Sequence, residues 1–265
     1  MHCLSKEKIW LIANLALRQF LQRYQGSFFG VLWPFIAAAL QLAIYAFVFS
    51  VILTAKWQQL GITAPEQELP FWLIMFAGMN VYFFVNEMIA VAPGMITSVP
   101  NYVKKIKFPL EVLPIVNLLV SAVTSCVFLV ILVLAIVFVG HPHWWILLAP
   151  LVFVQAAFWC LGFSWLLGTA GVFVRDLQQA VPFLLQLLLF ATPIFYPLSA
   201  VPERFRGIVQ CNPLTFLVET FRNLALWGIA PHWGVFAAWT LASIAFAYGG
   251  YQVFQRLRGT FADVL

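Results

Sequence analysis

The sequence predicts an all-α, polytopic membrane protein with six transmembrane helices. Of its 265 residues, 63% are hydrophobic and only 9% are charged, which is typical of chains whose lipid-facing surface is apolar. From Val112 to Val174 the chain contains no Asp, Glu, Lys or Arg. Because roughly 20 apolar residues in a helix cross a bilayer core about 30 Å thick, this stretch is long enough for two spans and a connector. We therefore treat residues 1–265 as a single transmembrane domain.

The first element we expect is an amphipathic helix over residues 6–25 that lies on the membrane surface. Apolar residues recur there at helical spacing, which gives the helix one face for lipid and one for water. Its wetter side has Glu7, Asn14, Arg18 and Gln22. A cleaved signal peptide is disfavoured, because Arg18 and Arg23 follow the apolar run at once and no small-residue cleavage site appears.

Six apolar stretches follow this helix. The spans we expect are residues 30–53, 71–91, 110–139, 145–173, 179–196 and 234–252. Between the last two, Pro193 and Pro197 break the fifth span, and two short apolar segments follow. Apolar segments of about 10–14 residues are more often re-entrant or interfacial than spanning, so short periplasmic re-entrant helices are expected there.

The basic residues predict the orientation of the chain. With six spans, ten of the 14 Lys and Arg residues fall on the side that holds both termini, and four fall on the other side. By the positive-inside rule, both termini are then cytoplasmic. The net charge of +5 does not indicate nucleic-acid binding, because these residues are scattered and form no long basic run.

The sequence lacks the motifs of an enzyme. It contains no GxxxxGK[ST] phosphate loop, no HExxH and no GxSxG, and its four Cys have no paired spacing. We therefore expect no catalytic residues and no metal site. Apart from Glu111 at the start of the third span, Glu87 is the one acid inside a predicted span; it is a functional candidate or a helix-end carboxylate that reaches the interface.

A family resemblance becomes specific at Arg23-Tyr24-Gln25-Gly26-Ser27-Phe28-Phe29-Gly30-Val31-Leu32-Trp33. This segment resembles the R-Y-[RQ]-G-S-x-x-G-x-L-W element that opens the first span of permease subunits of type-2 ABC exporters. Later blocks agree in order: Arg175-Asp176-Leu177, Thr192 to Pro197, Asn212-Pro213-Leu214 and the C-terminal Phe261-Ala262-Asp263-Val264-Leu265. One position departs from the commonest form, because Gln25 stands where many members have Arg or Lys.

The resemblance implies a homodimer of six-span subunits in the bacterial inner membrane, joined to two copies of a cytoplasmic ABC ATPase. It implies export of a polyprenyl-diphosphate-linked polysaccharide, with O-antigen as the first expectation and teichoic acid or capsule as the next. This chain would bind no cofactor, since ATP and Mg²⁺ would sit on the ATPase. Two alternatives stay open: a type-2 exporter of a small lipid or drug, and a membrane-embedded glycosyl- or acyltransferase.

Four candidate sites follow from the resemblance and the residue chemistry. For substrate entry we expect Arg18, Arg23, Tyr24, Gly26, Ser27, Gly30 and Trp33. For coupling to the ATPase we expect Lys104, Lys105, Lys107, Phe108, Pro109, Arg175 and Asp176. For the channel lining we expect Tyr45, Phe49, Tyr82, Phe83 and Phe84. For a periplasmic gate we expect Pro193, Pro197, Asn212, Pro213, Glu219 and Arg222, of which the last two are three apart on a helix and can pair.

Each site also has a purely structural reading. Arginines at head-group depth suit a diphosphate, but they also meet anionic lipid. The two glycines of the entry segment allow an elbow that needs no ligand. The three lysines suit a docking surface or a simple positive-inside anchor. Flat rings let sugars slide, yet most rings in such a chain face lipid or pack between helices.

Overall fold

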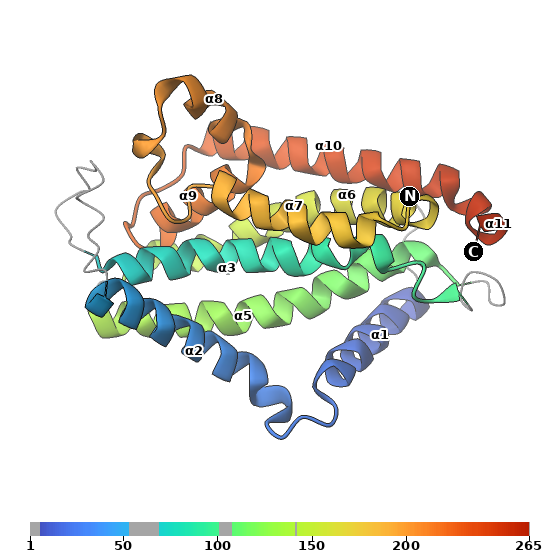
Figure 1. The fold of residues 1–265 in the computed structure, drawn as a ribbon, viewed down its shortest axis with the longest axis horizontal. Helices are drawn as coiled ribbons and strands as arrows, with labels where there is room; N and C mark the ends of the chain where they lie inside the picture. Colours follow the sequence, from blue (N-terminus) through green and yellow to red (C-terminus); the bar gives the residue numbers. More distant parts are fainter. Residues whose placement is uncertain (1–5, 53–68, 101–107, 141, 265) are drawn as a thin grey trace.

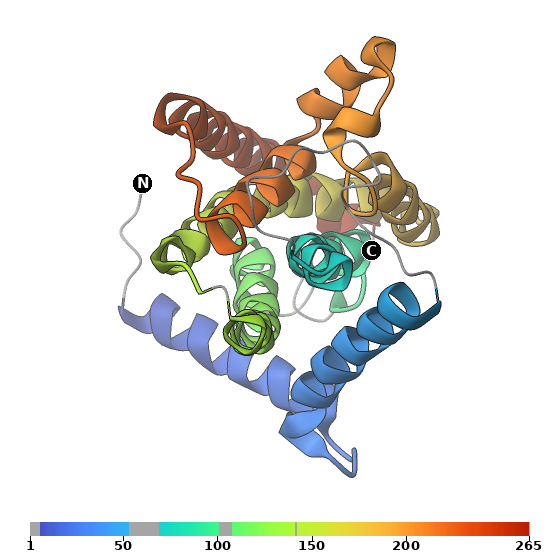
Figure 2. The same cartoon turned by 90° about the vertical axis from the view of Figure 1, so that its left-hand side faces the viewer.

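The computed structural model describes residues 6–52, 69–100, 108–140 and 142–264, and within these residues the chain is helical and forms no strand (Figure 1). The predicted all-α class is confirmed for this part of the chain. Long helices run side by side along the molecule: α3 (Phe71–Ala90), α5 (Leu113–Val139), α6 (Ala149–Phe173) and α10 (Trp233–Leu257). Figure 2, which views the bundle from one end, shows α3 near its middle.

The helix at the centre, α3, is apolar around nearly its whole circumference. In the most apolar 18-residue segment of Phe71–Gly94, 72% of the residues are buried inside the protein. The corresponding share in Gly30–Ile52 is only 6%. A helix that is hydrophobic on every side is stable only where other helices surround it, and α2, α5, α6, α7 and α9 all contact α3. The stretch that includes α2 lies at the periphery and leaves most of its apolar surface exposed.

The first two helices, α1 (Lys6–Tyr24) and α2 (Trp33–Phe47), form a V along one side of the bundle (Figure 1). The turn at its apex has φ of +80° at Gly26 and +50° at Gly30. A residue with a Cβ is strained in this left-handed region, which is why the elbow uses glycine. Pro34 then stands in the first turn of α2, where its missing N–H leaves no hydrogen bond unmade. The elbow predicted from the sequence is therefore present.

Four described stretches are long and apolar enough to cross a membrane: Gly30–Ile52, Phe71–Gly94, Leu110–Val139 and Trp144–Phe173. The helix α7 (Leu177–Ala191) is apolar but has 15 residues, about 22 Å, which is less than the thickness of the hydrocarbon core. The helix α10 has 25 residues, and its last six include three polar residues, Gln252, Gln255 and Arg256. The count of six spans therefore stays a prediction.

The predicted fifth span, residues 179–196, ends earlier as a helix than expected. The helix α7 stops at Ala191, and Thr192 is extended, with φ of −100° and ψ of 139°. Pro193 disfavours helical geometry in the residue before it, which explains this end point. Two short helices follow, α8 (Glu203–Cys211) and α9 (Pro213–Ala225), where the sequence indicated short segments.

Candidate functional site

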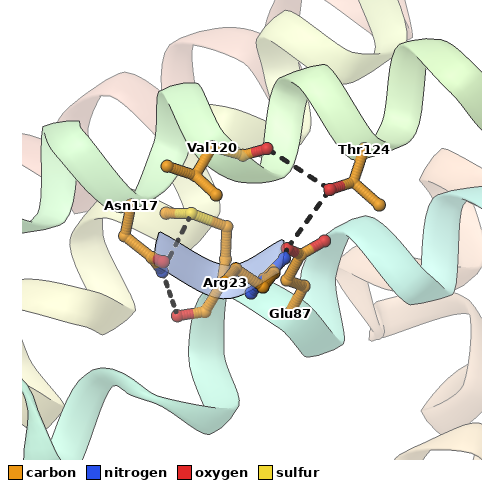
Figure 3. Close-up of polar contacts among 6 residues, drawn as sticks. Arg23, Glu87, Asn117, Val120 and Thr124 are labelled. Atoms are coloured by element: carbon orange, nitrogen blue, oxygen red, sulfur yellow. Dashed lines mark hydrogen bonds and ion pairs between the residues drawn. The ribbon is translucent and has the colours of Figure 1, made fainter. Parts of the chain in front are cut away.

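The helix α1 is joined to the bundle by an ion pair. The Arg23 guanidinium of α1 donates to the carboxylate of Glu87 on α3 (Figure 3). The Thr124 hydroxyl of α5 lies 3.5 Å from the same carboxylate oxygen, and the Asn117 amide of α5 donates to the Met88 carbonyl of α3 at 3.3 Å. Three helices that are distant in the sequence therefore meet at Glu87.

Apolar contacts support this junction. Ile12 and Ala16 of α1 are buried against Val112, which precedes α5, and against Val116 and Val120 of α5. Other apolar residues of α1 point outward, and Trp10 is 70% exposed. A helix with one buried and one exposed apolar face suits a position at the membrane surface, where the exposed face meets lipid.

The carboxylate of Glu87 compensates the charge of Arg23. Partial burial lowers the pKa of Arg23, but the hydrogen bond and the negative charge of Glu87 outweigh it, so the net pKa lies above the usual value. Arg23 thus stays cationic and already has a partner. A diphosphate at Arg23 would have to compete with Glu87 for the same donors.

Arg18, one and a half turns before Arg23 on the same helix, lies in a different setting. It lines a hollow of about 750 Å³ between α1 and the start of the α2 region, which we call the entry hollow. Its wall combines polar Arg18, Gln22 and Gln25 with apolar Leu17, Leu21 and Val31. Among the described residues, no ion pair joins Arg18 to a carboxylate.

The entry hollow has the chemistry that a lipid diphosphate needs. A guanidinium offers several N–H donors in a fixed planar arrangement and can bind phosphate oxygens in pairs. The apolar side chains beside it suit the hydrocarbon part of the same ligand. Tyr24 also lines the hollow, while Gly26, Ser27, Gly30 and Trp33 form the adjoining elbow and the start of α2.

A second arginine, Arg222 of α9, is fully buried at the other end of α3. It donates to the carbonyl of Ile74 at 3.1 Å and to those of Pro193 and Ile194 at 2.6 Å each. Glu219, three residues earlier, lies 3.5 Å away, so the pairing expected from their spacing is confirmed. We call these five residues the Arg222 cluster, which ties α3, the end of α7 and α9 together.

Burial lowers the pKa of Arg222 to about 10, and Glu219 opposes this shift. The guanidinium therefore remains charged at neutral pH. Its space is provided by Gly78 on α3, because a Cβ there would lie 2.7 Å from Arg222 Nη2. Only a residue without a side chain lets the guanidinium lie this close to the α3 backbone.

Asn212 organises the remainder of the predicted gate. Its side-chain oxygen accepts a hydrogen bond from the backbone N–H of Leu214 at 3.0 Å, which caps α9, and its amide donates to the Thr192 hydroxyl at 3.1 Å. Pro213 occupies the first turn of α9. Pro197 precedes a single 3₁₀ turn, Leu198–Ala200. The predicted gate residues Pro193, Asn212, Pro213, Glu219 and Arg222 thus lie in one connected region.

The predicted coupling residues are only partly described. Lys104, Lys105 and Lys107 lie outside the described residues, whereas Phe108 and Pro109 lead into the 3₁₀ turn Leu110–Val112 before α5. Arg175 and Asp176 are exposed immediately before α7. Gln178 donates to the Thr97 hydroxyl at 3.0 Å, so the loop of Arg175 and Asp176 adjoins the loop that leads to the lysines.

The predicted channel rings pack within the subunit. Tyr45, Phe49 and Phe71 form a chain of ring contacts, with centroids 6.3 and 5.0 Å apart. Tyr82 and Phe84 are buried, and the Tyr82 hydroxyl donates to the carbonyl of Leu185 at 3.0 Å. A role in lining a channel stays a prediction for Tyr45, Phe49, Tyr82, Phe84 and half-buried Phe83.

The model of the family described as ABC-2 type transporter matches residues 11–226. The chain belongs to this family. The matched range begins in α1 and ends just after α9, so it includes both the entry hollow and the Arg222 cluster.

Three curated relatives extend the similarity over nearly the whole chain. An O-antigen export system permease protein from Myxococcus xanthus is 28% identical over 259 residues, which cover 96% of this chain and 94% of the relative. Two O-antigen export system permease proteins from Klebsiella pneumoniae are 25% and 26% identical over 246 residues, which cover 92% of this chain and 90% of each relative.

Sequence reasoning missed several residues that the structure brings together. It singled out Glu87 and Arg23 separately but not as partners, because nothing in the order of residues shows that α1 folds back onto α3. It also missed Gly78, whose role depends on an arginine 144 positions later. The uncharged surroundings of Glu87 were the available signal, since an isolated acid in an apolar helix needs a cationic or polar partner.

Proposed function

We propose that this chain is the membrane-spanning subunit of an ATP-driven exporter of O-antigen. The observation that supports this best is the alignment with O-antigen export permeases over 92–96% of the chain. The entry hollow adds a chemical reason, because it combines a guanidinium with apolar walls. A polysaccharide linked to a polyprenyl diphosphate has a matching pair of features at its lipid end.

In this proposal, two copies of the chain join two copies of a separate ABC ATPase in the bacterial inner membrane. Six spans place both termini in the cytoplasm, with residues 179–196, most of which belong to α7, as the fifth span and residues 234–252 of α10 as the sixth. The chain itself binds no nucleotide, and ATP and Mg²⁺ are held by the ATPase. Lys104, Lys105, Lys107, Phe108, Pro109, Arg175 and Asp176 contact that ATPase.

The α7 to α9 region acts as the gate on the periplasmic side, and the aromatic side chains line the path of the sugar chain. The Arg222 cluster supports the first role, because it fixes α9 to α3 and to the end of α7. A displacement of either helix would therefore move α9 as well.

Deletion of the gene in its own host tests the function. We expect O-antigen to disappear from the cell surface while its lipid-linked precursor accumulates on the cytoplasmic side. Immunoblotting of intact cells and of extracted lipid-linked oligosaccharide measures both. Re-expression of the chain restores export, and the purified tagged chain brings an ATPase with it.

The same experiment distinguishes the alternatives. A small-lipid or drug exporter predicts unchanged surface polysaccharide together with altered drug resistance or lipid content. A glycosyl- or acyltransferase predicts a polymer that still reaches the surface but lacks one sugar or acyl group. Either result would contradict the proposed function.

Reporter fusions test the six-span topology. A periplasmic enzyme joined after Leu60, Pro142 or Thr215 should be active, and the same enzyme at either terminus should be inactive, because the basic residues are concentrated on the other side. A cytoplasmic signal after Pro142 would contradict the topology.

A further inference from the structure

The described chain ends in a short segment that shares an apolar cluster with residues before and after the stretch 101–107. This stretch includes Lys104, Lys105 and Lys107, and we call it the coupling region. After α10 come a 3₁₀ turn, Arg258–Thr260, and the helix α11, Phe261–Val264. Phe261 is fully buried, with its ring centroid 5.6 Å from Phe254 and 6.3 Å from Phe173. The same apolar cluster includes Ile96 and Leu110. Ile96 precedes the three coupling lysines and Leu110 follows them.

Arg258 makes two polar contacts on the side that follows the lysines. Its Nη1 donates to Glu111 Oε2 at 2.9 Å, and its Nη2 donates to the carbonyl oxygen of Phe108 at 3.2 Å. One guanidinium thus bridges Phe108, which follows the coupling region, and Glu111 in the 3₁₀ turn that precedes α5. The planar group with separate donors allows this double contact, which a lysine ammonium reproduces poorly.

Glu111 connects the same point to two further helices. Its second carboxylate oxygen lies 3.9 Å from the Nζ of Lys8 on α1, and its backbone carbonyl accepts a hydrogen bond from Trp165 Nε1 of α6 at 3.3 Å. The helix α6 leads directly to Arg175 and Asp176, the second part of the predicted coupling surface. The residues around Glu111 therefore join the C-terminal segment to both coupling loops.

We propose that Arg258 and Phe261 form a C-terminal clamp that holds the two ends of the coupling region, so that movement of the ATPase is passed into α3 and α5. This inference rests on the proposed coupling to an ATPase. Force reaches a helix only through connections that hold their geometry. The clamp provides such connections through the buried ring of Phe261 and the guanidinium of Arg258, which donates from two nitrogens. Arg258 is a positioning residue, because it touches neither substrate nor nucleotide.

Arg258→Gln and Arg256→Gln make a matched pair for the test. Arg256 is an exposed arginine two residues earlier, and among the described residues no hydrogen bond or ion pair joins it to Phe108 or Glu111. In purified permease–ATPase complex in liposomes, Arg258→Gln should lower export per ATP hydrolysed about threefold or more, while Arg256→Gln leaves the ratio unchanged. Arg258→Lys should give an intermediate ratio, because lysine keeps the positive charge but cannot donate to Glu111 and to Phe108 from two separate nitrogens.

A second measurement needs no ATPase. A nitroxide label on Lys105→Cys, with the native cysteines replaced by Ser, reports the mobility of the coupling region in the permease alone. Arg258→Gln should increase that mobility and Arg256→Gln should not. Phe261→Leu, which keeps most of the apolar volume but removes the ring, serves beside Phe261→Ala in case the smaller alanine side chain prevents insertion.

The outcomes separate the clamp from the proposed function. Unchanged label mobility together with an unchanged export ratio would overturn the clamp. A lower yield of Arg258→Gln with a normal ratio would overturn it too, since Arg258 would then serve folding only. Failure of the wild-type chain to associate with any ATPase would contradict the proposed function, while the label comparison would still test whether the clamp holds the coupling region.

Discussion

Arg222 and Arg18 are the same residue type in opposite surroundings. Arg222 is fully buried, and its donors are taken by three backbone carbonyls and approached by Glu219. Arg18 lines the entry hollow, and among the described residues no carboxylate pairs with it. A guanidinium whose donors are used inside the fold is part of the scaffold, whereas one at an open hollow can recognise a phosphate. Local surroundings, more than residue type, assign their roles.

Arg23 lies between these two cases. It is close to Arg18 on α1, but its contact with Glu87 makes it a link between helices. Of the two arginines predicted for substrate entry, we propose Arg18 as the binding residue and Arg23 as the anchor of the helix that presents it, because Arg23 is already paired with Glu87.

The largest effect on stability is expected at Arg222. Arg222→Met leaves three buried carbonyls without their donor, which should cost about 3–5 kcal/mol. The protein should insert poorly or show a much lower unfolding temperature in detergent. Arg204→Met on exposed α8 is the control and should change stability by about 0.5 kcal/mol or less. Similar thermal stability of the two variants would contradict a structural role for buried Arg222.

Gly78→Ala should have the next largest effect, because its Cβ would lie 2.7 Å from Arg222 Nη2. Overpacking of this kind costs about 1–3 kcal/mol. Gly207→Ala on α8 is a matched control, since a Cβ there meets nothing within 4 Å, and it should be neutral or slightly stabilising. Thermal unfolding of both variants in one detergent measures the difference, and an equal response would contradict the close approach at Gly78.

A smaller effect is expected at the junction of α1. Arg23→Gln, Glu87→Gln and the double variant form a cycle whose coupling energy should be about 1 kcal/mol, since the pair is partly open to solvent. Chemical unfolding of each purified variant supplies the values. Additive effects of the two single changes would show that the pair does not hold α1 to α3.

The sequence predicted the helices better than the contacts between them. Apolar runs located most helices to within a few residues, and glycine located the elbow at Gly26, because these signals are local. Pro193 and Pro197 marked the break after the fifth span, although the helix ends at Ala191, before the predicted end at residue 196. The spacing of Glu219 and Arg222 predicted their pairing for the same reason. The distant partners Ile74 and Gly78, like the contact of Arg258 with Glu111, depend on tertiary packing that no local pattern specifies.

The most direct test of the account is the binding of a polyprenyl diphosphate to the purified subunit in nanodiscs. Arg18→Gln should leave thermal stability unchanged and weaken binding about tenfold, which corresponds to about 1.4 kcal/mol, and Arg18→Lys should weaken it less. Arg256→Gln, an exposed arginine away from the hollow, should bind normally. Equal affinity of the wild type, Arg18→Gln and Arg18→Lys would contradict a diphosphate site at Arg18 and would leave the entry hollow as a lipid-facing surface.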